Sequence, residues 1–178
     1  MNQTWPLGAP AIAREPISFD AVFRQYAPYV RRTLRWLGVA AANVEDVCQE
    51  VFIVVHRRLH ELDSSGSLRA WVRQICVHAA QNERRRVRRR PEHHEPLAEI
   101  PTPSAQHGFV ELREMQARLH ALLEKLTDEQ RTVFVLYEIE QLTMPEVASA
   151  IGCPLQTAYS RLHVARSRVA TLHAEATR

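Results

Sequence analysis

The sequence has little of what sheet-rich, secreted or membrane-spanning proteins need. Its 178 residues include 5 glycines and 3 cysteines, and no apolar run approaches the roughly 20 residues that cross a bilayer. Cys48, Cys76 and Cys153 form no CxxC pair, so we expect free thiols, buried at the first two positions. Segment 1–16 lacks the pattern of a secretory signal and is expected to be a mobile extension. These absences favour a cytoplasmic protein that is not inserted in a membrane.

Lysine is almost absent as well. Lys125 is the single lysine among 23 basic residues, and the formal net charge is only +3. The arginines are unevenly placed, because six of them fall within residues 84–90. This run favours a polyanionic partner, although a solvated charge run or a disordered basic tail would look the same. If all six arginines met phosphates, affinity would fall by about three decades between roughly 50 and 200 mM salt.

Helical periodicity dominates the first half of the chain, and no strand pattern is present. We expect one helix to end at Gly38, a second to begin after Asn43 as its N-cap, and a third to run from about Leu68 into the arginines. In the first helix we expect these side chains to face inward: Phe19, Val22, Phe23, Tyr26, Val30, Leu34 and Leu37. Together the three helices predict a small helical domain over residues 17–90.

Segment 91–107 contains four prolines and has no helical period, so it predicts a flexible linker. Helical signals then return, with capping boxes at Thr127 and Thr143 and a last helix after Pro154. One apolar stripe consists of Phe109, Leu112, Met115, Leu119, Leu122 and Leu123, and another of Leu155, Ala158, Leu162, Ala165, Val169 and Leu172. The sequence therefore predicts an all-α chain with a second small domain at 108–178.

Residues 143–168 read as a short helix, a glycine-containing turn and a longer helix. This is the order of a helix-turn-helix, whose second helix lies in the major groove of DNA. If the apolar stripe faces inward, the early part of the longer helix presents side chains that can reach base edges and phosphates. These are Gln156, Thr157, Tyr159, Ser160, Arg161 and His163. A helical hairpin with a solvated outer face has the same periodicity and is the alternative.

Together these residues resemble the extracytoplasmic-function group of the sigma-70 family, over about residues 19–169. Residues 44–52, VEDVCQEVF, are similar to the family's region 2.2 helix, and WVRQI at 71–75 is similar to its W-L-x-x-I signature. LTDEQR with the following Val-Phe, at 126–134, resembles the start of region 4. Residues 153–166 are similar to the family's recognition helix.

The resemblance implies a non-enzymatic transcription initiation factor with a region 2 and a region 4 domain. It implies binding to core RNA polymerase through Asp46, Gln49, Glu50 and Ile53. It implies contact with a melted −10 element through Ser64, Ser65, Arg73, Gln74, His78, Gln81, Asn82, Arg85, Arg86 and Arg89. The duplex −35 element would be read by the six polar residues of the last helix. An anti-sigma protein is a common partner of such factors, and the resemblance implies no cofactor, metal or catalytic residue.

Four positions depart from the family's pattern. His78 stands where the family usually has asparagine, and Asn82 where it often has aspartate. Gln156 replaces the usual glycine and Tyr159 the usual lysine or arginine. Losing a cation in the recognition helix removes a guanine contact worth roughly 1–3 kcal/mol of discrimination. We therefore expect the preferred promoter to differ from the family's common one.

Three other functions compete with this reading. His56 and His60 have a spacing that can bind zinc, but Arg57 stands where a metalloprotease has glutamate and no third ligand is evident. A conventional helix-turn-helix regulator would bind DNA without polymerase, yet it has no reason to carry the helix at 44–52 or the arginine-rich helix. A hydrolase would need a nucleophile–base set or a phosphate loop, and we find neither.

Overall fold

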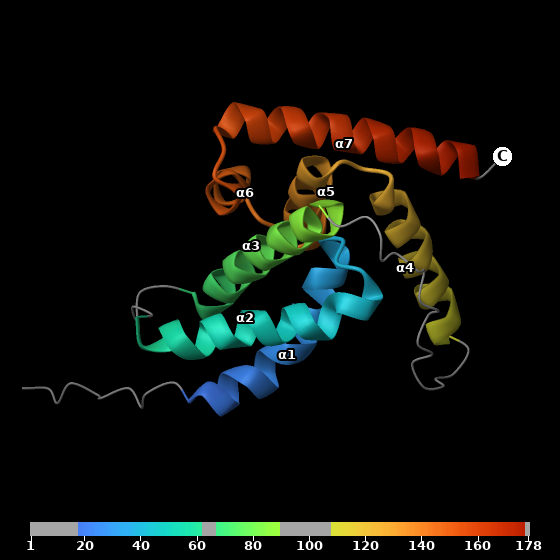
Figure 1. The fold of residues 1–178 in the computed structure, drawn as a ribbon. Coiled ribbons are helices and arrows are strands. Elements are labelled where there is room, and N and C mark those ends of the chain that lie inside the picture. The colour runs from blue at the N-terminus through green and yellow to red at the C-terminus, as the bar shows by residue number, and fades with distance from the viewer. Residues whose placement is uncertain (1–17, 62–66, 90–107, 177–178) are drawn as a thin grey trace, which may run out of the picture.

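The computed structural model describes residues 18–61, 67–89 and 108–176, with the side chains of residues 108–113 and 176 excepted. Seven α-helices and no strand occur in these ranges, which confirms the all-α prediction (Figure 1). The helices are α1 (Phe19–Trp36), α2 (Val44–Arg58), α3 (Leu68–Arg89), α4 (Gly108–Glu124), α5 (Asp128–Phe134), α6 (Met144–Ile151) and α7 (Leu155–Ala176).

Helices α1, α2 and α3 pack against one another through the apolar faces that their periodicity predicts. Fully buried side chains come from all three, among them Val30, Val51 and Val77. Gly38 ends α1 with a φ of +90°, a conformation that glycine adopts without strain. Cys48 and Cys76 are buried free thiols as predicted, and burial raises the pKa of both.

Two expectations for this half were wrong. Helix α2 begins after Asn43, but the Asn43 side chain does not cap it and donates instead to Glu83 Oε1 at 2.6 Å. Phe23 was expected to face inward, yet 41% of its surface is exposed. Its ring stands edge-on to Phe52 at a centroid distance of 4.7 Å, so it covers the core from outside.

Both predicted capping boxes open helices in the second half. Thr127 Oγ1 accepts the Gln130 N–H at 3.3 Å, and Gln130 Oε1 accepts the Thr127 N–H at 3.2 Å. Glu146 Oε2 accepts from the N–H and the hydroxyl of Thr143, at 2.9 and 2.7 Å. Gly152 ends α6 in the left-handed conformation with a φ of 66°, which turns the chain into α7.

The helix that the Thr127 capping box opens does not continue as a regular α-helix. Helix α5 ends at Phe134, and residues Val135–Ile139 form one π-helical turn, whose last N–H groups reach carbonyls five residues back. Gln141 then takes a φ of 56°. The π turn shifts the end of this segment, so that Glu140 and Leu142 point toward the first half of the chain.

Two apolar positions of the second half are more exposed than expected. Met115 is 65% and Leu155 43% exposed, although each lies on a predicted stripe. Among the α4 side chains that the structure describes, Leu123 near the C-terminal end is fully buried in the core. Leu155 is the first residue of α7, before the helix meets its neighbours at Ala158.

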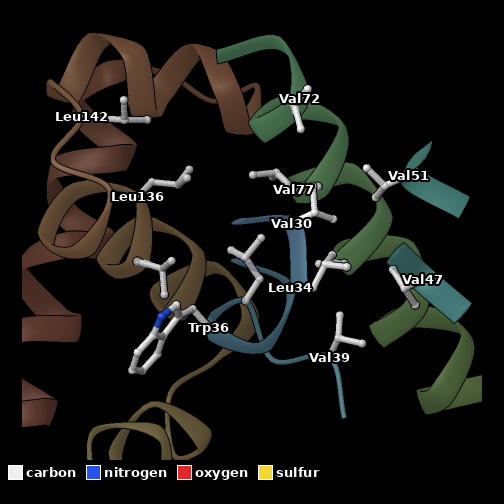
Figure 2. Close-up of a cluster of buried hydrophobic side chains, with 14 of the residues drawn as sticks. Val30, Leu34, Trp36, Val39, Val47, Val51, Val72, Val77, Leu136 and Leu142 are labelled. Carbon is white, nitrogen blue, oxygen red and sulfur yellow. The ribbon is translucent and has the colours of Figure 1, made fainter. Parts of the chain in front are cut away.

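The two halves of the chain share one hydrophobic core. Figure 2 shows Leu136 and Leu142 of the second half facing Val30, Leu34 and Val77 of the first. The predicted linker 91–107 lies outside the described residues, so the division into domains stays a prediction.

Candidate functional site

The outer face of α2 combines carboxylates with exposed apolar surface. Asp46, Gln49 and Glu50 are exposed, as predicted, and Ile53 is 50% exposed. Beside them lies a groove of about 360 Å³, lined by Phe19, Phe23, Gln49, Phe52, Ile53, His56 and Arg57. Sequence reasoning missed the phenylalanines as part of this surface, because their place on an apolar stripe marks them as core. The groove can therefore accommodate an apolar side chain, and the carboxylates beside it can pair with the positive charges of a basic partner.

Two neighbouring groups modify the charge of this face. Glu45 is paired with Arg31 at 2.8 Å, so its carboxylate is already neutralised. Arg86 is bound to Glu83 at 2.6 Å, which together with the more distant Glu50 and Asp46 raises its pKa. Arg86 therefore lies on the α2 side of α3 and not with the other arginines predicted to contact DNA.

His56 has a structural neighbour that accounts for its position. Its ring stands edge-on to Phe19 at a centroid distance of 4.9 Å. Within the ranges that the structure describes, no three histidine, cysteine or acidic side chains come together as metal ligands.

Helix α3 carries a polar stripe that faces away from the core. Its buried side follows Val72, Cys76, Val77 and Ala80. Besides Arg86, which pairs with Glu83, the exposed members of the predicted −10 set are Gln74, His78, Asn82, Arg85 and Arg89. Steps of three and four residues separate them, so they share one side of the helix. The arrangement offers amide, imidazole and guanidinium groups to a single nucleic-acid strand.

The rest of the predicted −10 set is not gathered on that stripe. Arg73 and Gln81 are half-buried. Arg73 lies within electrostatic reach of Glu146 at the start of α6, so it faces the second half of the chain. Ser64 and Ser65 lie outside the described residues.

Helices α6 and α7 form the predicted helix-turn-helix, and α7 runs along the outer side of α5 and α6 (Figure 1). Ala158, Leu162 and Ala165 are buried, which turns the opposite side of α7 to solvent. Of the predicted −35 residues, Gln156, Tyr159, Ser160 and His163 are exposed, whereas Thr157 and Arg161 are half-buried. These six residues thus occupy the first three turns of one accessible helix.

One further arginine fixes the direction of α7. Arg166 Nε binds Glu138 Oε1 at 2.6 Å, and its guanidinium lies 5.2 Å from the centre of the Tyr137 ring. Both partners belong to the π-helical segment. Arg166 therefore anchors α7 and was not singled out for this role by the sequence.

Comparison with known proteins identifies the family. The family model described as Sigma-70 region 2 matches residues 22–90, and that described as Sigma-70, region 4 matches residues 116–169. The first range contains the α2 face and the α3 stripe, and the second contains the predicted −35 residues of α7. The chain is an extracytoplasmic-function member of the sigma-70 family.

Named relatives of this sigma factor agree in length and function. RNA polymerase sigma-H factor of Pseudomonas aeruginosa is 27% identical, over 85% of this chain and 84% of the relative. ECF RNA polymerase sigma factor RpoE of Cereibacter sphaeroides is 29% identical, over 88% and 86%. Both are named as sigma factors and neither as an enzyme.

Solved structures show the same fold in this family. The sigma factor RpoE in complex with the anti-sigma factor NepR, from Bartonella quintana, has a TM-score of 0.66 at 21% identity and covers 88% of this chain and 96% of that one. CnrH in complex with the cytosolic domain of CnrY has a TM-score of 0.63 at 22% identity, over 88% of both chains. In the part of the sigma factor that the structure describes, no helix has the length and apolar character of a membrane span.

Proposed function

We propose that this sigma factor joins core RNA polymerase and directs it to promoters, with α2 as the polymerase contact, α3 at the −10 element and α7 at the −35 element. The observation that carries the proposal is the presence of three separate exposed polar faces on α2, α3 and α7. A conventional helix-turn-helix regulator needs only the last of them. Work at the polymerase would place the protein in the cytoplasm.

The α2 face suits a basic partner surface with an apolar projection. Phe23 and Ile53 supply exposed apolar area, and interfaces take most of their energy from such anchors. Asp46 and Glu50 add charge at the rim of the groove, where electrostatics mainly guides association and orientation. We assign this face to a basic, helical surface of the polymerase.

The α3 stripe suits a strand whose bases have left the duplex. Arg85 and Arg89 can hold phosphates, which position the strand without reading it. Gln74, His78 and Asn82 follow on the same side and can bond to unpaired base edges. Taking a base out of the stack costs a few kcal/mol, which such contacts would offset. His78 and Asn82 depart from the family's pattern, so the −10 preference is expected to differ.

The test is transcription with purified components. The protein, core RNA polymerase and a promoter fragment are combined, and the RNA product is measured with and without the protein. Initiation that depends on the protein supports the sigma role. Specific duplex binding in the absence of polymerase, with no polymerase contact, would instead support the conventional regulator.

Exchange of Glu50 for lysine tests the α2 face. Glu50 is exposed, so Glu50→Lys should leave folding unchanged while placing a like charge against a basic surface. We expect affinity for core polymerase to fall about tenfold, in a binding titration with labelled protein. Glu61→Lys, also exposed and just beyond the end of α2, carries the same charge change and should bind as the parent does. Loss of folding in Glu50→Lys would contradict the assignment of inner and outer faces.

Exchange of Tyr159 for arginine tests the reading helix. Tyr159 is exposed, and a guanidinium there can bond in pairs to guanine. Tyr159→Arg should shift the preferred −35 sequence toward guanine at one base pair, by roughly 1–3 kcal/mol of discrimination. Selection of −35 variants by the polymerase complex measures this. Ala170→Arg, farther along α7, adds the same charge and should leave the preference unchanged. An unaltered preference in Tyr159→Arg would remove Tyr159 from the reading set.

We also propose an anti-sigma protein as a regulatory partner. The support is the fold shared with RpoE of Bartonella quintana, which was solved in complex with the anti-sigma factor NepR. Purification of the tagged protein from its host, followed by identification of stoichiometric partners, tests this. Recovery with polymerase subunits alone would argue against it.

A further inference from the structure

Arg131 of α5 is a buried cation whose Nε has no hydrogen-bond partner. Only 5% of the residue is exposed. Among the described residues, this Nε is the one buried side-chain nitrogen or oxygen atom in that condition. A buried charge without partners is strongly unfavourable, and a guanidinium stays protonated in proteins. Arg131 therefore needs a negative charge that no described side chain supplies by direct contact.

Glu140 shows, by contrast, how this fold accommodates a buried charge. Its side chain is 3% exposed. Three side chains donate to it: Tyr29 Oη at 2.9 Å, Thr33 Oγ1 at 3.5 Å and Arg69 Nη2 at 3.4 Å. Burial, and then the charge of Glu140, raises the pKa of Tyr29 to about 12. The buried carboxylate thus has several donors, whereas the buried guanidinium lacks an acceptor.

Close neighbours fix the place of the Arg131 guanidinium. A Cβ atom on Gly38 would overlap Arg131 Nη1, so this approach to the backbone requires glycine. On the side of α4, the His120 ring stacks on Trp36 with a centroid distance of 4.0 Å and an angle of 2°. Burial, and then the charges of Arg35 and Arg131, lowers the pKa of His120 to about 4. A neutral imidazole cannot compensate the charge of Arg131.

A cavity of about 190 Å³ lies beside Arg131, between the segment after α1 and helices α3 and α5. A single water needs roughly 10–15 Å³ of such space, so the cavity can hold a considerably larger molecule. Arg84, Arg88 and Asp128 line it together with Arg131. The Arg88 side chain is 62% exposed, so the cavity can be reached from solvent on that side.

The charges that line this cavity do not balance. Asp128 is paired with Arg84 and, at 2.6 Å, with Arg88, so one carboxylate serves two guanidiniums. Glu83 also lines the cavity, but it is paired at 2.6 Å with Arg86, which does not. Three guanidiniums against one available carboxylate leave an excess of two positive charges. The cavity is therefore suited to an anion.

The guanidiniums lie close enough to act on one another. Burial, and next the positive charge of Arg84, lowers the pKa of Arg131 to about 10. Burial lowers the pKa of Arg84 in spite of Asp128, and the charge of Arg88 adds to that shift. Glu124 acts on Arg131 through its charge alone and is not part of the lining. An anion among the three guanidiniums would both pair with Arg131 and relieve their mutual repulsion.

We propose that this cavity is a binding site for a small molecule that ends in a phosphate or diphosphate group. A terminal phosphate carries close to two negative charges at neutral pH, which matches the excess in the lining. Its oxygens can accept pairs of parallel hydrogen bonds from a guanidinium, a geometry that arginine offers and lysine does not. Val39 and Val87, also in the lining, offer apolar contact to the rest of the molecule.

A phosphate of the DNA backbone is a less suitable occupant. It carries a single charge and is joined to a sugar on both sides. An intact duplex cannot bring such a group against a guanidinium that is only 5% exposed. The exposed Arg85 and Arg89 are better placed for it. The proposed site is thus separate from the DNA-binding stripe and does not rest on the function proposed above.

Isothermal titration calorimetry of the full chain with sodium pyrophosphate, at constant ionic strength, tests the site. We expect one pyrophosphate to bind per chain with a Kd below about 1 mM. Pyrophosphate at about 100 times this Kd should raise the Tm by roughly 5–10 °C. Sodium chloride at the same ionic strength should not produce this rise.

Two variants separate the cavity from the rest of the arginine run. Arg131→Met keeps a long unbranched side chain but removes the buried charge, so pyrophosphate binding should be lost while the circular dichroism spectrum is unchanged. Arg88→Gln removes a cation at the rim and should weaken binding about tenfold. Arg89→Gln is the matched control, because Arg89 is the next residue, is exposed and does not line the cavity. It should bind pyrophosphate as the parent does.

Three results would overturn the site: a parent Kd above about 1 mM, an Arg131→Met variant that binds as the parent does, or equal losses in Arg88→Gln and Arg89→Gln. If Arg131→Met does not fold, the comparison of Arg88→Gln with Arg89→Gln decides, because both side chains are exposed. Titration of a promoter duplex distinguishes the other source of phosphate. A parent that does not bind pyrophosphate, with duplex affinity that falls in Arg131→Met, would assign the cavity to the DNA backbone and overturn the proposal.

Discussion

Replacing Arg85 and Arg89 together by glutamine should lower the affinity of the polymerase complex for promoter DNA by about thirtyfold at about 0.15 M salt. Each phosphate contact contributes about −0.9 to the slope of log affinity against log salt, so two contacts change the slope by about 1.8. Both arginines are exposed on the α3 stripe, and within the described residues neither is in an ion pair. Their charges are therefore available to a nucleic acid, unlike those of Arg84 and Arg88.

A salt titration of promoter binding, followed by fluorescence anisotropy, measures both quantities. The matched control is Arg24→Gln with Arg58→Gln, which removes two charges from exposed positions of α1 and α2. The control should reproduce the parent's slope. Equal slopes for parent and Arg85/Arg89 variant would show that these arginines do not meet phosphates.

The sequence is a good guide wherever structure depends on residues close in the chain. Both capping boxes form between residues three apart, and Gly38 and Gly152 end helices through their own backbone conformation. The exposed members of the α2 and α7 faces also follow from periodicity, because a buried stripe fixes the opposite side as solvent-facing. Local rules therefore account for the helices and for most of the residues on each candidate surface.

Exposure along a stripe could not be predicted in the same way. Periodicity shows which side of a helix avoids water, but not how far a neighbouring helix extends along it. Met115 and Leu155 lie on the correct side but beyond the reach of a neighbouring helix, and Phe23 contacts Phe52 only from outside the core, so all three remain exposed. The groove beside Ile53 forms where such apolar side chains stay partly uncovered, so helical periodicity alone did not predict it.

The packing between the halves depends on contacts that no local pattern contains. The donors to Glu140 are 111, 107 and 71 residues away in the chain. The π turn before Glu140 directs it inward, and its sequence reads as ordinary helix. Arg73 and Arg86 illustrate the same limit, because each was assigned to DNA by its place in α3 and each lies near carboxylates of another element. A basic residue on an amphipathic helix can pair with any of several negatively charged groups, and only the tertiary structure decides which of them lies close to it.

The stack of His120 on Trp36 predicts a loss of stability in mild acid. Burial, followed by the charges of Arg35 and Arg131, lowers the pKa of His120 from its ordinary 6.5 to about 4. The unfolded chain therefore binds a proton at this residue below about pH 6.5, while the folded protein does so only below about pH 4. The free energy of unfolding should fall across this window by about 1–3 kcal/mol from this group, and then stay level. At higher pH the imidazole is neutral in both states and contributes nothing to the dependence.

Urea unfolding at intervals between about pH 7 and about pH 4 measures this loss. His120→Phe keeps an aromatic ring against Trp36 but cannot take up a proton, so its stability should fall less over the same window. All other groups are the same in both proteins, so the difference between the two curves isolates His120. His163→Gln removes an exposed histidine and serves as the control. Its stability should change with pH as that of the parent does. Coincident curves for parent and His120→Phe would mean that the imidazole is not held neutral between α1 and α4.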